Sequence, residues 1–347
     1  MSIISENELK SEIKSEKFKN FYFLFGEENY LTEYYTNLLI NKILGNDKNE
    51  FNFKVFFKNK LDIDELEKFC ELISFMSSQK CVLIKDLDFS SLSNSIVKRL
   101  KEIIENLPES TIIIVSQINL ENEKKRSSSF NSFAKFSEKN GNVIEFKKLS
   151  KLALEKQLIS WAKKLSKELS LNNAELIINN CGNNLLELKN EIEKLCAFSE
   201  NEITSEIINK VTIKKLEANV FELTKLIASK NFDKALNKLN ILIKMKESPI
   251  AILSILSSYY LDLYRVKIFK NAGESIYNIK NFFTDYKNKE FRLSNAQKDC
   301  NNLSLESIKK CIDLLTQADF KLKSSKVDSQ VILEELLIKI FQIYLKN

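Results

Sequence analysis

Two kinds of hydrophobic pattern divide this sequence, and the change between them near Lys148 constrains the fold most. Before that point, short apolar runs alternate with stretches in which apolar residues recur every three or four positions, the periods of strands and helices. Strands that alternate with helices form parallel sheets covered on both faces. The predicted strands are 21–25, 51–57, 81–84, 111–116 and 143–146, and the predicted helices are 31–44, 62–75 and 93–106.

After Lys148 the sequence shows helical periods only, and its few glycines (5) and prolines (2) fit a helix-dominated body. The predicted helices are 152–169, 173–180, 185–198, 201–211, 219–230, 232–245, 249–270, 304–323 and 327–345. The polar segment 271–303 is expected to hold a loop and one or two further helices. We therefore predict an α/β domain (1–148), a small helical domain (149–213) and a helical bundle (214–347).

The composition excludes several kinds of functional site. The 347 residues include no histidine, which removes His-based acid–base catalysis, Ser–His and Cys–His nucleophiles and histidine metal ligands. None of the six cysteines forms a Cys-x-x-Cys pair, so we expect no zinc site and interpret them as buried side chains in a reducing compartment. The first ten residues lack a signal-peptide pattern, and the apolar segment 249–269 contains Asp262 and Arg265, which favours a buried helix over a membrane span. We expect a soluble, cytoplasmic protein.

The net charge of +6 permits contact with nucleic acid but does not require it. Four basic side chains are candidate DNA contacts by charge alone: Lys85, Lys124, Lys125 and Arg126. The simpler interpretation of the charged segment 122–129 is an exposed, solvated loop. Tyr259 and Tyr260 could stack on bases, although a helix as apolar as theirs more often buries its tyrosines.

The first predicted strand runs into a turn that has the position of a phosphate-binding loop but not its residues. A P-loop ends in Gly-Lys-Ser/Thr, whose amides, lysine and hydroxyl hold the phosphates and magnesium. Here Gly26 is followed by Glu27 and Glu28, and two carboxylates would repel a triphosphate. We expect both glutamates to lie in the first turn of the next helix, where the helix dipole favours negative charge.

The metal-binding strand of a nucleotide-binding domain is also incomplete. Such a strand should end in Asp-Glu, but the third predicted strand is followed by Lys85, Asp86 and Leu87. The simpler interpretation is that Asp86 caps a turn. We therefore expect no bound nucleotide, metal or other cofactor, and no intrinsic catalysis.

A series of different short motifs is spread along nearly the whole chain. The motifs are Phe-Leu-Phe-Gly-Glu-Glu-x-Tyr-Leu at 23–31, the helix-to-strand junction 74–84, the strand 111–117 followed by a charged loop, 190–195 with 203–204, 219–223, 247–250 and 319–323. Together they resemble the DNA polymerase III delta subunit family of bacterial clamp loaders. Their colinear order carries the resemblance, because each motif is short.

This resemblance implies an AAA+-like architecture: a RecA-like parallel sheet domain, then an all-α lid and an all-α collar. It implies a non-catalytic subunit of the DNA polymerase III holoenzyme that binds and opens the sliding clamp for loading onto primed DNA. The implied partners are the clamp (the beta subunit), the gamma/tau and delta-prime subunits through the collar, and primed DNA within the complex, with no membrane.

In the resembled family, an apolar pair at the end of a helix in the first domain contacts the clamp, and the pair corresponds here to Phe75 and Met76. The buried face of the predicted helix 62–75 comprises Leu66, Phe69, Leu72 and Ile73. Phe75 and Met76 fall just beyond that face among serines, as suits a protein-docking element. The alternative is that both side chains turn inward beneath the third strand. The order here is aromatic then Met, which leaves the depth of insertion open.

Two other functions remain open from the residues alone. An active AAA+ ATPase with a divergent loop would be stabilised by Mg-ATP. A nucleic-acid scaffold unrelated to replication would bind DNA without partners, with steep salt dependence.

Overall fold

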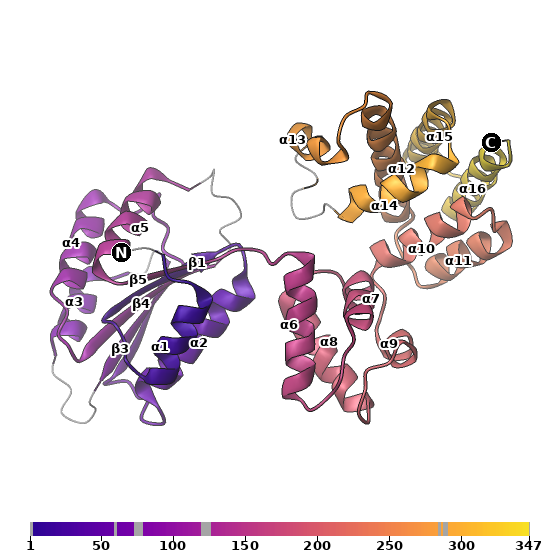
Figure 1. Cartoon of the computed structure of the whole chain (residues 1–347). Helices are drawn as coiled ribbons and strands as arrows, with labels where there is room; N and C mark the ends of the chain where they lie inside the picture. Colours follow the sequence, from indigo (N-terminus) through magenta and orange to yellow (C-terminus); the bar gives the residue numbers. More distant parts are fainter. Residues whose placement is uncertain are drawn as a thin grey trace. The chain divides into compact units, whose positions relative to one another are not determined.

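The computed structural model describes residues 3–58, 61–72, 79–118, 126–283, 286 and 291–346. The chain divides into two compact units, unit 1 (1–149) and unit 2 (150–347). Figure 1 shows the sheet in unit 1, coloured from indigo to magenta, whereas unit 2 is built from helices.

Unit 1 is a five-stranded parallel sheet in the order β2-β3-β4-β1-β5, with helices on both faces. Its elements are α1 (Glu6–Ser15), β1 (Phe21–Gly26), α2 (Asn29–Leu44), β2 (Phe53–Phe57), α3 (Ile63–Glu71), β3 (Lys80–Lys85), α4 (Asn94–Glu105), β4 (Thr111–Gln117), α5 (Ser128–Asn140) and β5 (Asn142–Phe146). The predicted alternation and the parallel sheet are confirmed.

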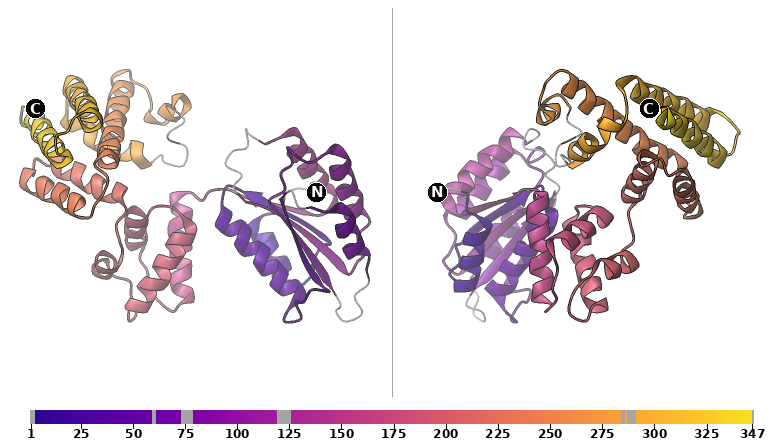
Figure 2. Two further views of the ribbon diagram at one scale, coloured as in Figure 1. Left: turned by 180° about the vertical axis from the view of Figure 1, so that it is seen from behind. Right: turned by 45° about the vertical axis from the view of Figure 1, so that its right-hand side comes forward.

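The central strands of unit 1 are buried on both faces, as their continuous apolar runs predict. One face packs against α3, α4 and α5, where Phe23 lies within 5.6 Å (ring centroids) of both Phe130 and Phe133. The other face packs against α2. The views in Figures 1 and 2 agree on this three-layer arrangement within unit 1.

The apolar period predicts neither α1 nor α5. Each helix presents only a few apolar side chains to the core, such as Leu9 and Ile13 of α1. Polar contacts hold α1 in place: Glu12 accepts hydrogen bonds from the Tyr22 hydroxyl (3.1 Å) and from Nδ2 of Asn142 (2.7 Å). Glu12 and Asn142 are 130 residues apart in the sequence, so no local pattern indicates their contact.

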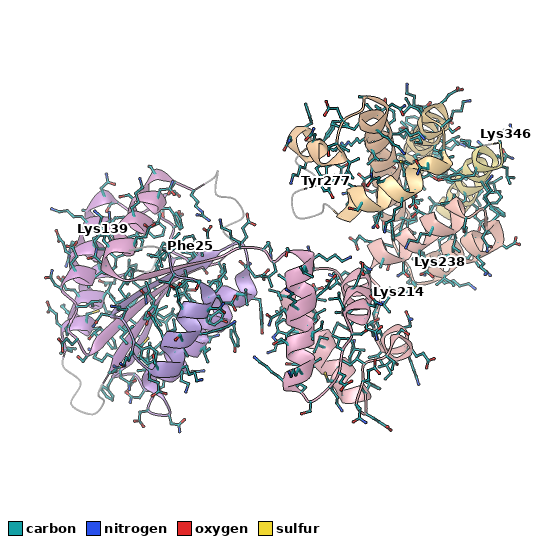
Figure 3. The ribbon with its side chains drawn as sticks, viewed as in Figure 1. Phe25, Lys139, Lys214, Lys238, Tyr277 and Lys346 are labelled. Atoms are coloured by element: carbon teal, nitrogen blue, oxygen red, sulfur yellow. The ribbon has the colours of Figure 1, made fainter. Side chains whose placement is uncertain are left out.

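Unit 2 consists of helices close to the predicted bounds. They are α6 (Lys151–Lys164), α7 (Leu171–Cys181), α8 (Leu185–Phe198), α9 (Ser205–Val211), α10 (Leu216–Ala228), α11 (Phe232–Lys244), α12 (Pro249–Asn271), η3 (Ile276–Asn278), α13 (Ile279–Phe282), α14 (Phe291–Asp299), η5 (Cys300–Asn302), α15 (Leu305–Ser324) and α16 (Ser329–Leu345). The helices α10 to α16 share one hydrophobic core. Lys238, labelled in Figure 3, joins α11 to α10 through Asn219 (2.9 Å) and Glu222 (2.8 Å).

The long helix α12 carries a buried carboxylate that ties three segments of unit 2 together. Asp262 accepts two hydrogen bonds from the Arg292 guanidinium (2.8 and 3.0 Å) and one from the Tyr286 hydroxyl (2.7 Å). Burial raises the pKa of Asp262, and the hydrogen bonds and the arginine charge oppose that rise. Among the described residues, no helix is long and apolar enough to span a membrane.

All six cysteines are buried and free, as predicted. Burial raises the pKa of the Cys70, Cys81 and Cys311 thiols to about 12, so these thiols are neutral and unreactive at physiological pH.

Replacing Asp262 by Ala is expected to lower the free energy of unfolding by about 3 kcal/mol, because it leaves Arg292 without its buried partner. Asp262→Asn keeps an acceptor for Tyr286 and should cost less. Urea denaturation followed by helical circular dichroism measures both changes. The matched control is Asp313→Ala at an exposed position of α15, expected within about 0.5 kcal/mol of wild type. Equal effects at positions 262 and 313 would contradict the account of this network.

Candidate functional site

The turn between β1 and α2 lies where a nucleotide-binding domain holds phosphate. β1 ends at Gly26 and α2 begins at Asn29, so Glu27 and Glu28 form the whole connection. A P-loop needs a longer connection between its first glycine and its Gly-Lys pair, because its backbone amides wrap around the phosphates. This turn is too short for that geometry.

Gly26 is explained by the packing of two strands. Its φ is +150°, and a Cβ atom at this position would lie 2.1 Å from the carbonyl oxygen of Phe146 on β5. The same oxygen accepts a hydrogen bond from the backbone N–H of Glu28 (3.0 Å). Only glycine permits this approach, so the residue is required here whether or not any phosphate binds.

An ion pair between a buried carboxylate and an exposed lysine lies at the start of α2. The Glu28 carboxylate is 3% exposed, and Nζ of Lys148 lies 3.0 Å from it. The prediction that Glu27 and Glu28 lie in the first turn of the helix is wrong, because α2 begins only at Asn29 and Glu28 is its N-cap residue. The lysine beside this turn thus neutralises a carboxylate of the protein itself.

A second ion pair, with both side chains largely buried, involves Glu145 of β5. Nη2 of Arg126 is 2.6 Å from the Glu145 carboxylate, and the two side chains are 10% and 11% exposed. The guanidinium also lies 4.9 Å from the ring centre of Phe25, a residue labelled in Figure 3. The interpretation of Arg126 as part of a solvated loop is therefore wrong, because ion pairing and a cation–π contact bury it. This burial disfavours Arg126 as a DNA contact.

Asp86 follows β3, and its side chain bonds to the residue after the neighbouring strand β4, so the prediction that it caps a turn is wrong. Its φ is +53°, a conformation that Asp tolerates better than most residues. Its Oδ1 accepts the backbone N–H of Ile118 (2.9 Å), and its own N–H donates to Ser116 (2.9 Å). In the described part of the chain, no cluster of three or more Cys, Asp or Glu side chains could hold a metal ion.

The predicted docking residues Phe75 and Met76 lie outside the described residues, between Leu72 and Gln79. The preceding helix α3 buries Leu66 and Phe69, as predicted. The prediction that Leu72 lies on the same buried face is wrong: its side chain is 66% exposed. The backbone turns extended at this residue (φ −60°, ψ 121°), which ends the helical period.

Comparisons with known proteins identify the family. A model of "DNA polymerase III, delta subunit" matches residues 22–147, and a model of "DNA polymerase III delta subunit, C-terminal domain" matches residues 217–340. The chain belongs to the DNA polymerase III delta subunit family.

Individual members of this family match along most of the chain. It is 24% identical to the DNA polymerase III subunit delta of Bacillus subtilis over 335 residues, 94% of each protein. It is 28% identical to a probable DNA polymerase III subunit delta of Aquifex aeolicus over 308 residues, 85% of this chain and 78% of that protein. The structure is similar in fold to the Bacillus subtilis DNA clamp loader delta protein, with a TM-score of 0.66 and 23% identity over 97% of this chain and 99% of that one.

The structure gives no evidence that the other candidate residues contact DNA. Lys85 is half-buried, and Lys124 and Lys125 lie outside the described residues. Tyr259 is buried with its hydroxyl donating to Asp299 (3.0 Å), and Tyr260 is fully buried. The expectation that the helix buries both tyrosines is confirmed.

No local pattern in the sequence marks Lys148 or Glu145 as a site residue. Each acts through a partner that only the folded sheet brings near, such as Glu28 for Lys148. The burial of Lys80 could have been noticed from the sequence, because this charged residue directly precedes the apolar run 81–84. Buried lysines are rare without a specific partner.

We expect Mg-ATP to leave the thermal unfolding of the chain unchanged, because the β1–α2 turn is too short and is lined by carboxylates. A ligand at about 100 times its Kd would add about 2.7 kcal/mol of stability, which differential scanning fluorimetry detects. A P-loop ATPase in the same buffer is the positive control. A clear, magnesium-dependent rise in Tm would contradict this expectation and favour an active ATPase.

Proposed function

We propose that the chain is the delta subunit of a bacterial clamp loader, which binds the sliding clamp and opens its ring for loading onto primed DNA. Family membership carries this proposal, because the two family models match both the sheet of unit 1 and the helices α10 to α16. The match over 94% of a DNA polymerase III subunit delta gives it further support.

In this proposal the chain catalyses no reaction and holds no nucleotide or metal. The ion pair between Glu28 and Lys148 supports this, because it occupies the position where a P-loop would present its lysine to phosphate. Gly26, Glu27 and Glu28 then form a retained turn of the fold. Nucleotide hydrolysis belongs to partner subunits.

We propose Phe75 and Met76 as the clamp-contacting pair. In the sequence they fall between α3, which ends at Glu71, and β3, which begins at Lys80. A large aromatic and an adaptable thioether are the side-chain types that fill pockets on partner proteins. Their setting among Ser74, Ser77 and Ser78 favours a solvent-facing position.

The remaining assignments follow the family. The segments 1–148, 149–213 and 214–347 are proposed as the AAA+-like, lid and collar domains, with the collar contacting the gamma/tau and delta-prime subunits. The chain would contact primed DNA within that complex, in the cytoplasm. The six free, buried cysteines are compatible with a reducing compartment.

A nucleic-acid scaffold independent of replication is the competing function. Its electrostatic binding would fall steeply as salt rises. The burial of Arg126 and Tyr259 disfavours it, because neither side chain is free to contact DNA. We expect the isolated chain to bind primed DNA weakly in fluorescence anisotropy at physiological salt. Tight, strongly salt-dependent binding would favour the scaffold instead.

The double substitution Phe75→Ala with Met76→Ala is expected to abolish the complex with purified sliding clamp. The physical reason is the loss of two apolar anchors, and hot-spot residues of this kind each contribute about 2 kcal/mol or more. Isothermal titration calorimetry of the full chain with the clamp measures the affinity, and circular dichroism verifies an unchanged helix content.

The matched control replaces two exposed residues of the same types in unit 2, Met245 and Phe320, which are 50% and 71% exposed. Met245→Ala with Phe320→Ala should leave clamp affinity unchanged. If the variant at 75 and 76 binds as tightly as wild type, the docking assignment is wrong. If the wild-type chain itself fails to bind the clamp, the proposed function is wrong.

A further inference from the structure

A short linker joins two groups of helices within unit 2. The first helix group, α6 to α9, packs on itself, whereas the second helix group, α10 to α16, shares its own hydrophobic core. Because α9 ends at Val211 and α10 begins at Leu216, the linker is the segment 212–215. It contains neither glycine nor proline. Whether such a linker acts as a hinge depends on what its backbone and side chains bind.

Asn180 of α7 holds both ends of this linker. Its side chain is 4% exposed, and its Nδ2 donates to the hydroxyl of Thr212 (3.3 Å). Its backbone carbonyl accepts the N–H of Lys215 (2.9 Å). The Thr212 hydroxyl donates in turn to the carbonyl of Ile208 (2.7 Å). One buried residue of the first helix group therefore binds the first and the last residue of the linker, and leaving these bonds unmade would cost about 1–3 kcal/mol per buried group.

The two lysines of the linker form ion pairs with different helix groups. Lys215 pairs with Glu187 of α8, in the first group. Lys214, labelled in Figure 3, has its Nζ 3.3 Å from the carboxylate of Glu222 on α10, in the second group. Pairs as exposed as these each contribute about 0–1 kcal/mol, so they add to the buried hydrogen bonds rather than replace them.

Further contacts fix the path of the linker on both sides. Asn219 of α10 is 5% exposed, and its Nδ2 donates to the carbonyl of Lys214 (3.1 Å). On the other side, the Lys215 side chain lies against Gly182 at the end of α7. A Cβ atom at Gly182 would be 3.3 Å from the Nζ of Lys215 and 3.5 Å from its Cδ. The linker is thus bound by hydrogen bonds, charge and packing.

We propose that the linker 212–215 is a rigid connection, which makes the first and second helix groups move as one body. Asn180 and Glu187 hold it from the first group, and Asn219 and Glu222 hold it from the second. A hinge would have to release these buried hydrogen bonds together. A partner that binds the second helix group would therefore also fix the orientation of the first. This inference does not depend on clamp binding.

The test measures the distance between two spin labels in the full chain by double electron–electron resonance. The labels are attached through Lys156→Cys on α6 and Asn237→Cys on α11, both at exposed positions. The six native cysteines are buried, so the introduced thiols react first. We expect a single narrow distance distribution. A broad distribution in this chain would show a free hinge and overturn the proposal.

Two sets of substitutions release the linker. Asn180→Ala with Lys215→Met removes the bond to Thr212 and the ion pair with Glu187, and we expect the distribution to become about twofold wider or more as backbone freedom returns. Circular dichroism verifies the helix content. In the second set, Lys215→Glu places like charges together and should widen the distribution, and adding Glu187→Lys should narrow it again. General destabilisation would not be reversed by a second substitution of this kind.

The matched control is Lys189→Met, which removes another exposed ion pair of α8, with Glu193 (3.5 Å). It should leave the distribution unchanged. If Asn180→Ala with Lys215→Met keeps the narrow distribution of the labelled chain, the linker contacts do not hold the two groups and the proposal is wrong. If Lys189→Met widens the distribution equally, or if the charge exchange fails to restore it, the role given to Lys215 is wrong.

Discussion

The approach of β5 to the end of β1 is the constraint on which the rest of unit 1 depends. Gly26 lies so close to the Phe146 carbonyl that any side chain there would collide with it, and the same carbonyl accepts the N–H of Glu28. This contact sets the short turn into α2 and brings Glu28 against Lys148. Gly26 and Glu28 are therefore integral to the packing of this sheet.

Buried charged side chains are stabilised by different interactions at the carboxyl and amino edges of the sheet. At the carboxyl edge, the pairs Glu28–Lys148 and Glu145–Arg126 satisfy buried charges with charges of the protein itself. At the amino edge, Lys80 has no carboxylate partner among the described residues. Its ammonium group donates hydrogen bonds to the carbonyls at the end of α3. In the proposed function the first edge holds no ligand, and the second presents the docking segment.

The sequence predicts the elements whose patterns are local and strong. The strand Thr111–Gln117 is a continuous apolar run, and α8 carries a stripe of leucines and isoleucine at helical spacing, so both were predictable. The helix α1 is not, because it buries only Leu9 and Ile13 and depends on a hydrogen bond between Glu12 and the distant Asn142. The helix α5 was not predicted either, although it buries Phe130 and Phe133 at helical spacing. The ion-pair partners of Glu28 and Arg126 are also distant in the sequence, so no local pattern indicates them. The exposed Leu72 shows the limit of periodicity, since the helix ends one residue before it.

Hydrogen–deuterium exchange of the full chain, with and without purified sliding clamp, tests the central claim most directly. The claim is that the amino edge of the sheet, between α3 and β3, meets the clamp while the β1–α2 turn takes no part. The account predicts slower exchange in peptides that span the end of α3 through Lys80, and unchanged exchange at Gly26 to Asn29. Protection at the β1–α2 turn without protection near Lys80, or no protection anywhere in unit 1, would contradict it.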